Sequence, residues 1–178
     1  MASAQTHSPR PDLQLHAAVP SADERPGRRR ELTAQAARYL GAVSILLVGA
    51  VHAQQYYQAF FSSVPTIGTL FLLSFIGAGV VGTALFAPVR LLGRRVGDLI
   101  LSLAALGAIG IALGTLVSLL YSEYRPLFGF MESGYRLAVE LTLLFDGMTT
   151  VFLGVFLALV APPLVRSFRS RHLRATQT

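Results

Sequence analysis

The chain contains no cysteine and no lysine among its 178 residues. The absence of cysteine excludes disulfide bonds, thiolate metal ligands, cysteine nucleophiles and palmitoylation. All 15 basic residues are arginines, and they outnumber 9 acidic residues to give a net charge of +6. In a soluble protein this excess would indicate nucleic-acid binding, but here the arginines flank apolar segments, where they orient helices and contact anionic head groups. We therefore expect membrane lipids as partners of these charges, and no nucleic acid.

The sequence also lacks the motifs of common catalytic and cofactor sites. It has no His-Glu-x-x-His, no Gly-x-Ser-x-Gly and no phosphate-binding loop. A b-type haem within a membrane usually needs two axial histidines on facing helices, and His52 is the one histidine in an apolar segment. We expect no catalytic residue and no cofactor, and we interpret the chain as non-enzymatic.

Four long apolar segments make up most of the chain. They are Ala36–Tyr57, Thr66–Pro88, Gly97–Leu120 and Leu137–Ala161. At a rise of about 1.5 Å per residue, each is long enough to cross the ~30 Å hydrocarbon core of a bilayer. The sequence therefore predicts an all-α integral membrane four-helix bundle over residues 35–165. Pro65 is expected to start the second helix, and Pro162 with Pro163 to end the fourth.

Polar tails flank the predicted bundle. Residues 1–34 are rich in proline, serine and charge and have no sustained helical or strand period, which predicts a disordered tail. Residues 166–178 form a second, basic tail. Arginines precede the first segment, follow the second and follow the fourth, whereas none lies in residues 58–65. By the positive-inside rule, we expect a multi-pass protein of the cell membrane with both termini in the cytoplasm.

Small residues recur at helical spacing in two of the segments. The third has Gly107, Gly110, Gly114 and Ser118, and the second has Ala78 and Gly82. Between helices surrounded by lipid, close backbone approach through small residues supplies the packing contacts. We predict that both groups are helix contact faces, and the sequence leaves open whether the face of the third helix packs within the chain or between protomers.

Asp146 lies about 14 Å along the fourth segment from its outer end, near the bilayer midplane. Because an aspartate at this depth costs about 2.5–3.5 kcal/mol, such residues usually face the interior of the bundle. Thr142, Thr149 and Thr150 share its helix face. No arginine lies at this depth, so we expect an uncharged carboxyl at neutral pH. Two uses fit: a hydrogen bond that fixes the fourth helix to Ser74, or the handling of ions or protons.

His52 is expected near the outer end of the first segment, at about the depth of Glu140. An imidazole and a carboxylate there form either a structural contact, a proton-linked pair or, with Glu132, a metal site. Arg136 precedes Glu140 by one helical turn and competes as an ion-pair partner. We expect no metal, and His52, Glu132 and Glu140 are the candidate ligands if one binds.

Part of the sequence resembles a group of small four-span bacterial membrane proteins. The residues that carry the resemblance are His52, the run from Pro65 to Leu73, Tyr124, and the run Phe128-Gly129-Phe130-Met131-Glu132. The resemblance covers most of the chain beyond residue 35. It implies the four-helix architecture and supports the choice of His52 and Glu132, but it implies no activity.

Three functions are compatible with these features. The first is a non-enzymatic accessory or scaffold subunit that presents its aromatic outer connection and basic tails to a membrane-protein partner or a second copy. The second is a small oligomeric transporter or proton-coupled carrier, with Asp146 on the pathway and His52 and Glu140 at its outer mouth. The third is a metal-dependent membrane enzyme.

Overall fold

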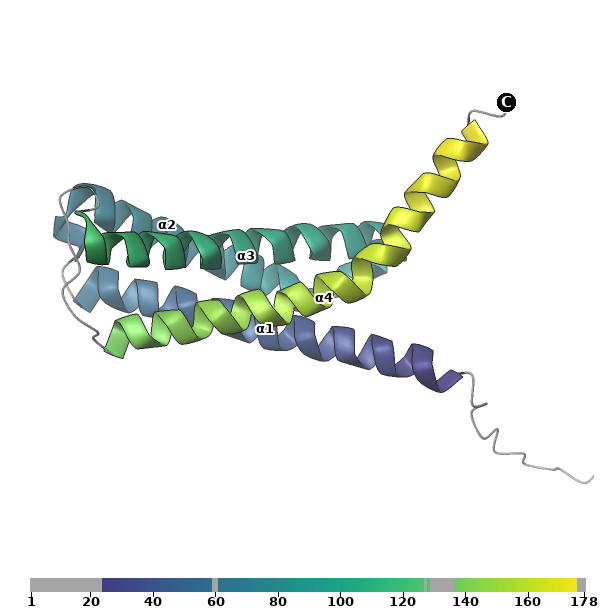
Figure 1. Cartoon of the computed structure of the whole chain (residues 1–178), viewed down its shortest axis with the longest axis horizontal. Coiled ribbons are helices and arrows are strands. Elements are labelled where there is room, and N and C mark those ends of the chain that lie inside the picture. Colours follow the sequence, from purple (N-terminus) through teal and green to yellow (C-terminus); the bar gives the residue numbers. More distant parts are fainter. Residues whose placement is uncertain (1–23, 59–60, 127, 129–136, 176–178) are drawn as a thin grey trace, which may run out of the picture.

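The computed structural model describes residues 24–58, 61–126, 128 and 137–175, and the regular structure within them is entirely helical (Figure 1). The long helices are α1 (Glu24–Gln58), α2 (Pro65–Phe86), α3 (Arg94–Tyr124) and α4 (Leu137–Ala175). Two short 3₁₀ turns, η1 (Phe61–Ser63) and η2 (Val89–Leu92), precede and follow α2 in the sequence. All four long helices have the length and apolar composition needed to cross a membrane. The predicted all-α architecture with four apolar helices is confirmed.

The helices form a ring in which each packs against the next and α4 returns to α1. One end of the bundle holds the ends of α1 and α3 and the starts of α2 and α4, and we call it the His52 end. The opposite end, which holds η2, is the Arg38 end. Figure 1 shows that the first part of α1 and the last part of α4 diverge beyond the bundle.

Two predicted helix limits are wrong. Helix α1 begins at Glu24, so residues 24–34 belong to a helix instead of a disordered tail. Helix α4 does not end at Pro162 and Pro163 but continues to Ala175. A proline inside a helix removes one hydrogen bond and bends the chain, and Figure 1 shows the last part of α4 turning away from the bundle.

Toward the Arg38 end, large apolar side chains fill the space between the helices. The largest fully buried ones are Ile45, Leu85, Leu101, Leu153 and Phe156. Ala78 is buried against α1, and a Cβ at Gly82 would come 2.6 Å from the Leu46 side chain. The small residues of α2 therefore lie where α1 and α2 meet, as their spacing predicts.

The middle of helix α3 packs on its neighbours largely through alanines. Its buried face includes Ala104, Ala105, Ala108 and Ala112. Exposed positions on the same helix are Gly107, Gly110, Gly114 and Ser118. Of the two alternatives that the sequence left open, contact within the chain is limited to Gly107, where a Cβ would lie 3.4 Å from Val81 Cγ1, whereas a Cβ at Gly110 or Gly114 would meet nothing within 4 Å. The alternative of a contact between protomers stays a prediction.

Candidate functional site

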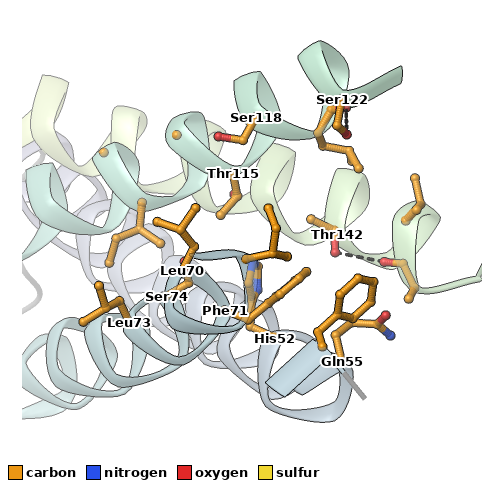
Figure 2. Close-up of a pocket in the computed structure, with 18 residues that line it drawn as sticks. His52, Gln55, Leu70, Phe71, Leu73, Ser74, Thr115, Ser118, Ser122 and Thr142 are labelled. Carbon is orange, nitrogen blue, oxygen red and sulfur yellow. Dashed lines mark hydrogen bonds between the residues drawn. The ribbon is translucent and has the colours of Figure 1, made fainter. Parts of the chain in front are cut away.

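A cavity of about 420 Å³ lies inside the bundle toward the His52 end. Side chains from all four helices and η1 line it, and Figure 2 shows them converging on the same space. Its polar lining residues are His52, Gln55, Ser74, Thr115, Ser118, Ser122 and Thr142. The remaining lining residues are apolar side chains and glycines, including Leu70, Phe71, Ile111, Gly110 and Gly114.

No charged side chain occurs among the described residues that line the cavity. Several hydroxyl groups there already donate their hydrogen to their own helix. Thr142 Oγ1 donates to the Ala138 carbonyl at 2.9 Å, and Ser122 Oγ donates to the Leu119 carbonyl at 2.7 Å. Since a hydroxyl oxygen has two lone pairs, these oxygens can still accept a hydrogen bond. The cavity is suited to a neutral, largely apolar molecule that donates a hydrogen bond.

His52 is buried in the cavity wall, with 5% of its surface exposed. Its Nδ1 donates to the Val48 carbonyl at 2.8 Å, because a carbonyl oxygen only accepts. In the neutral ring, Nε2 is therefore an acceptor. The ring packs against Phe71 with 5.3 Å between centroids, which fixes its position.

The cavity reaches the surface of the bundle between α2 and α3. Leu70 and Leu73 on α2, and Gly110 and Gly114 on α3, line the cavity and are also exposed. A Cβ at either glycine would meet nothing within 4 Å. The opening is on the side of the bundle, where the flanking side chains are apolar.

Asp146 lies behind the cavity wall and is completely buried. Its Oδ2 is 2.5 Å from Thr115 Oγ1 of α3, and these two oxygens share a hydrogen bond. Within the part of the chain that the structure describes, its Oδ1 has no hydrogen-bond partner, and neither has the hydroxyl of the buried Thr149. Thr115 lines the cavity whereas Asp146 does not. Thr115 therefore connects the carboxyl group to the cavity.

The structure brings together only some of the predicted site residues. Asp146 and Thr149 face the interior, and Thr142 lines the cavity, as their shared face predicts. Thr150 Oγ1 donates to the Asp146 carbonyl at 2.9 Å, within its own helix. The proposed bond from Asp146 to Ser74 is wrong, because the partner is Thr115. Thr115 could have been noticed as the single threonine of an apolar segment. The sequence does not show, however, which helices meet at the depth of Asp146.

His52 and Glu140 do not form a pair. His52 is buried, whereas Glu140 is exposed, and no hydrogen bond or ion pair joins these two described residues. Glu132 and Arg136 lie outside the described residues. Within the part of the chain that the structure describes, no group of three histidine or acidic side chains is placed to hold a metal ion.

Comparison with protein-family models, curated proteins and solved structures finds no match to this chain. Function is therefore inferred from the cavity and its lining.

Proposed function

We propose that this chain is a four-span protein of the cell membrane, with both termini in the cytoplasm, that binds a neutral, largely apolar molecule. It works without catalysis, as an accessory subunit of a membrane complex. The observation that carries the proposal is the uncharged cavity of about 420 Å³ at the His52 end. Binding sites for small molecules are concave, mostly apolar, and contain a few polar groups that orient the ligand.

The opening between α2 and α3 supports entry from the lipid. With the helices across a bilayer, Gly110 and Gly114 would face acyl chains, because both are exposed on the side of α3. A molecule dissolved in the membrane would then reach the cavity without crossing an aqueous phase. The ligand is expected to carry a hydroxyl or an amide N–H, since His52 Nε2 and the hydroxyl oxygens accept hydrogen bonds.

The packed half of the bundle supports binding in preference to transport. Beyond Asp146, toward the Arg38 end, Leu153, Phe156 and Leu101 are fully buried. Among the described residues, these apolar side chains fill much of the bundle interior on that side of Asp146. The ligand is therefore held within the bundle. A chain that holds a ligand without transporting it fits the role of an accessory subunit.

Substitution of Gly114 tests the binding site. Gly114→Leu would place a large side chain in the opening, whereas Gly79→Leu makes the same change on α2 at a glycine that does not line the cavity and has nothing within 4 Å of a Cβ. Native mass spectrometry of protein in native-lipid nanodiscs would report the bound small molecule. Wild type and Gly79→Leu should retain it, and Gly114→Leu should lose it by about tenfold or more. Equal occupancy in all three would contradict the proposal.

Co-purification tests the accessory role. Gentle extraction in mild detergent should recover a membrane-protein partner at fixed stoichiometry. Repeated recovery of the chain alone, with ligand bound, would reject the accessory role while leaving the binding site in place.

A proton-coupled carrier is the second candidate function. The hydrogen bond between Asp146 and Thr115 favours a carrier, because this contact joins a buried carboxyl group to the cavity. In reconstituted vesicles, Asp146→Asn would abolish proton-linked flux in a carrier, whereas in a binding subunit it would alter stability alone.

A metal-dependent enzyme has no supporting ligand cluster among the described residues. Bound metal in the same native mass spectra would be its evidence.

A further inference from the structure

A second cavity, of about 230 Å³, lies at the Arg38 end, where α1 faces the connection between α2 and α3. Two arginines, Arg38 and Arg90, contribute to its walls together with Gln35 and Tyr39. Apolar residues of the connection, Ala87, Pro88 and Leu91, complete it. The cavity is separate from the ligand site at the His52 end and shares no residue with it.

Arg38 is buried without a counter-charge. Only 7% of its surface is exposed, and its Nε has no hydrogen-bond partner among the described residues. The guanidinium lies over the Tyr39 ring, 4.4 Å from the centroid, and Tyr39 in turn stacks on Phe86. No carboxylate among the described residues lies within ion-pair distance of Arg38. Because a buried charge is costly unless it is paired, this environment calls for an anion.

The acidic groups nearby are already engaged. Asp98 accepts a hydrogen bond from Arg90 Nε at 3.0 Å, which fixes Arg90 at the cavity and leaves its terminal nitrogens available. Glu31 pairs with Arg94 at 3.6 Å on the exposed surface. Arg38, Arg90 and Asp98 together carry a net charge of +1, so the site is electropositive.

We propose that this cavity binds the phosphate group of an anionic phospholipid, held between the guanidinium groups of Arg38 and Arg90. Guanidinium groups recognise phosphate through paired, charge-assisted hydrogen bonds. The apolar rim favours a lipid over a free anion. Leu91 is 86% exposed and Phe86 is 42% exposed, so both are available to the glycerol and acyl portions of a lipid.

The test uses the full-length chain, delipidated in an uncharged detergent, with binding followed by native mass spectrometry. Three probes distinguish the contribution of the phosphate group from that of the acyl chains. Phosphatidylglycerol has both, diacylglycerol lacks the phosphate, and inorganic phosphate lacks the acyl chains. Phosphatidylglycerol should bind at least about tenfold more tightly than diacylglycerol. An equal concentration of inorganic phosphate should not displace it. Equal binding of the two lipids, or displacement by phosphate, would overturn the proposal.

Arg38→Gln and Arg95→Gln form a matched pair. Both remove one positive charge at the same end of the bundle, but Arg95 is exposed and does not line the cavity. Arg38→Gln should weaken phosphatidylglycerol binding about tenfold, and Arg95→Gln should change it less than about twofold. Equal losses would show general surface attraction and reject the site.

A second variant keeps the proposal testable if Arg38→Gln does not fold. Arg90→Gln combined with Asp98→Asn removes one guanidinium without changing the net charge. It should lower phosphatidylglycerol affinity by about threefold or more. Unchanged affinity in this double variant would reject a role for Arg90 and with it the two-arginine site. None of these variants touches the His52 end, so retained binding there distinguishes this test from that of the first cavity.

Discussion

Arg30 donates a hydrogen bond from Nη2 to the backbone carbonyl of Leu159 at 2.9 Å, across 129 positions of sequence. In a regular helix, this carbonyl would accept from the backbone nitrogen four residues later. That residue is Pro163, which has no N–H. An arginine near the start of α1 therefore supplies the donor that a proline in α4 removes, and the contact joins the two helices where both leave the bundle.

Arg30→Gln is expected to destabilise the packing of α1 on α4 by about 1 kcal/mol, because the hydrogen bond is charge-assisted but exposed. Unfolding of the detergent-solubilised protein by denaturing detergent would measure the change. Arg29→Gln is the control, since Arg29 is exposed and its side chain has no hydrogen bond or ion pair among the described residues. Pro163→Ala restores the missing N–H, so Arg30→Gln should cost less in that background. The same cost in both backgrounds would contradict the compensation.

Thr115→Val should destabilise the bundle, because it leaves both carboxyl oxygens of Asp146 without a partner. A double-mutant cycle with Asp146→Leu is expected to give a coupling energy of about 0.6–1.7 kcal/mol, the range for hydrogen bonds between membrane helices. Thr83→Val is the matched control, because the Thr83 hydroxyl donates only to carbonyls of its own helix, Gly79 at 2.7 Å and Val80 at 3.0 Å. Zero coupling would mean that the contact contributes nothing to stability.

Two glycines of α3 should respond in opposite directions to alanine. A Cβ at Gly97 would lie 2.7 Å from Arg90 Cα and 2.9 Å from Arg90 N, which are backbone atoms that cannot move aside cheaply. At Gly110 a Cβ would meet nothing within 4 Å. Gly97→Ala should therefore lower the thermal unfolding midpoint, whereas Gly110→Ala should stabilise by up to about 1 kcal/mol through helix propensity. If the two variants behave alike, the close approach of η2 to α3 is refuted.

His52→Phe should reduce ligand occupancy in the first cavity by about tenfold, because it removes the Nε2 acceptor. A phenyl ring preserves the contact with Phe71, so the unfolding midpoint should change little. Gln58→Phe provides the comparison, since Gln58 is exposed on the same helix and does not line the cavity. Full occupancy in His52→Phe would exclude a hydrogen bond from the ligand to this ring.

Single cysteines can establish the orientation of the chain, because the natural sequence has none. Gly27→Cys places an exposed thiol near the start of α1, and Ser62→Cys places one in η1, just beyond the other end of α1. In intact cells, a membrane-impermeant maleimide should label Ser62→Cys, and it should label Gly27→Cys only after permeabilisation. The reverse pattern would overturn the assignment of both termini to the cytoplasm.

Much of the architecture could be predicted from local sequence. The apolar runs around Asp146 and His52 predict long helices because a segment of that length and hydropathy has few other ways to satisfy its backbone in lipid. The interior position of Asp146 follows from the cost of exposing a carboxyl to hydrocarbon. Both conclusions depend on how a single segment interacts with lipid, and not on which other helices pack against it.

The packing faces could not be predicted in the same way. A helix that is apolar all round has no polar side to mark its exposed face, so neither composition nor spacing separates Gly110 from Ala108 on α3. The structure buries Ala108 and exposes Gly110. Likewise, Pro163 predicts a helix end, but the Leu159 carbonyl that it leaves without a backbone donor accepts a hydrogen bond from Arg30, a residue far away in the sequence.

The number of long helices, their apolar character and the interior position of one carboxyl group follow from the amino-acid sequence alone, because hydropathy and charge act residue by residue. Three relationships follow only from the packing of the helices: Thr115 is the partner of Asp146, His52 faces a cavity instead of Glu140, and Arg38 is buried with no carboxylate of the described residues beside it. These relationships depend on the relative depth and rotation of helices, which are set by packing between segments that the chain order does not encode locally.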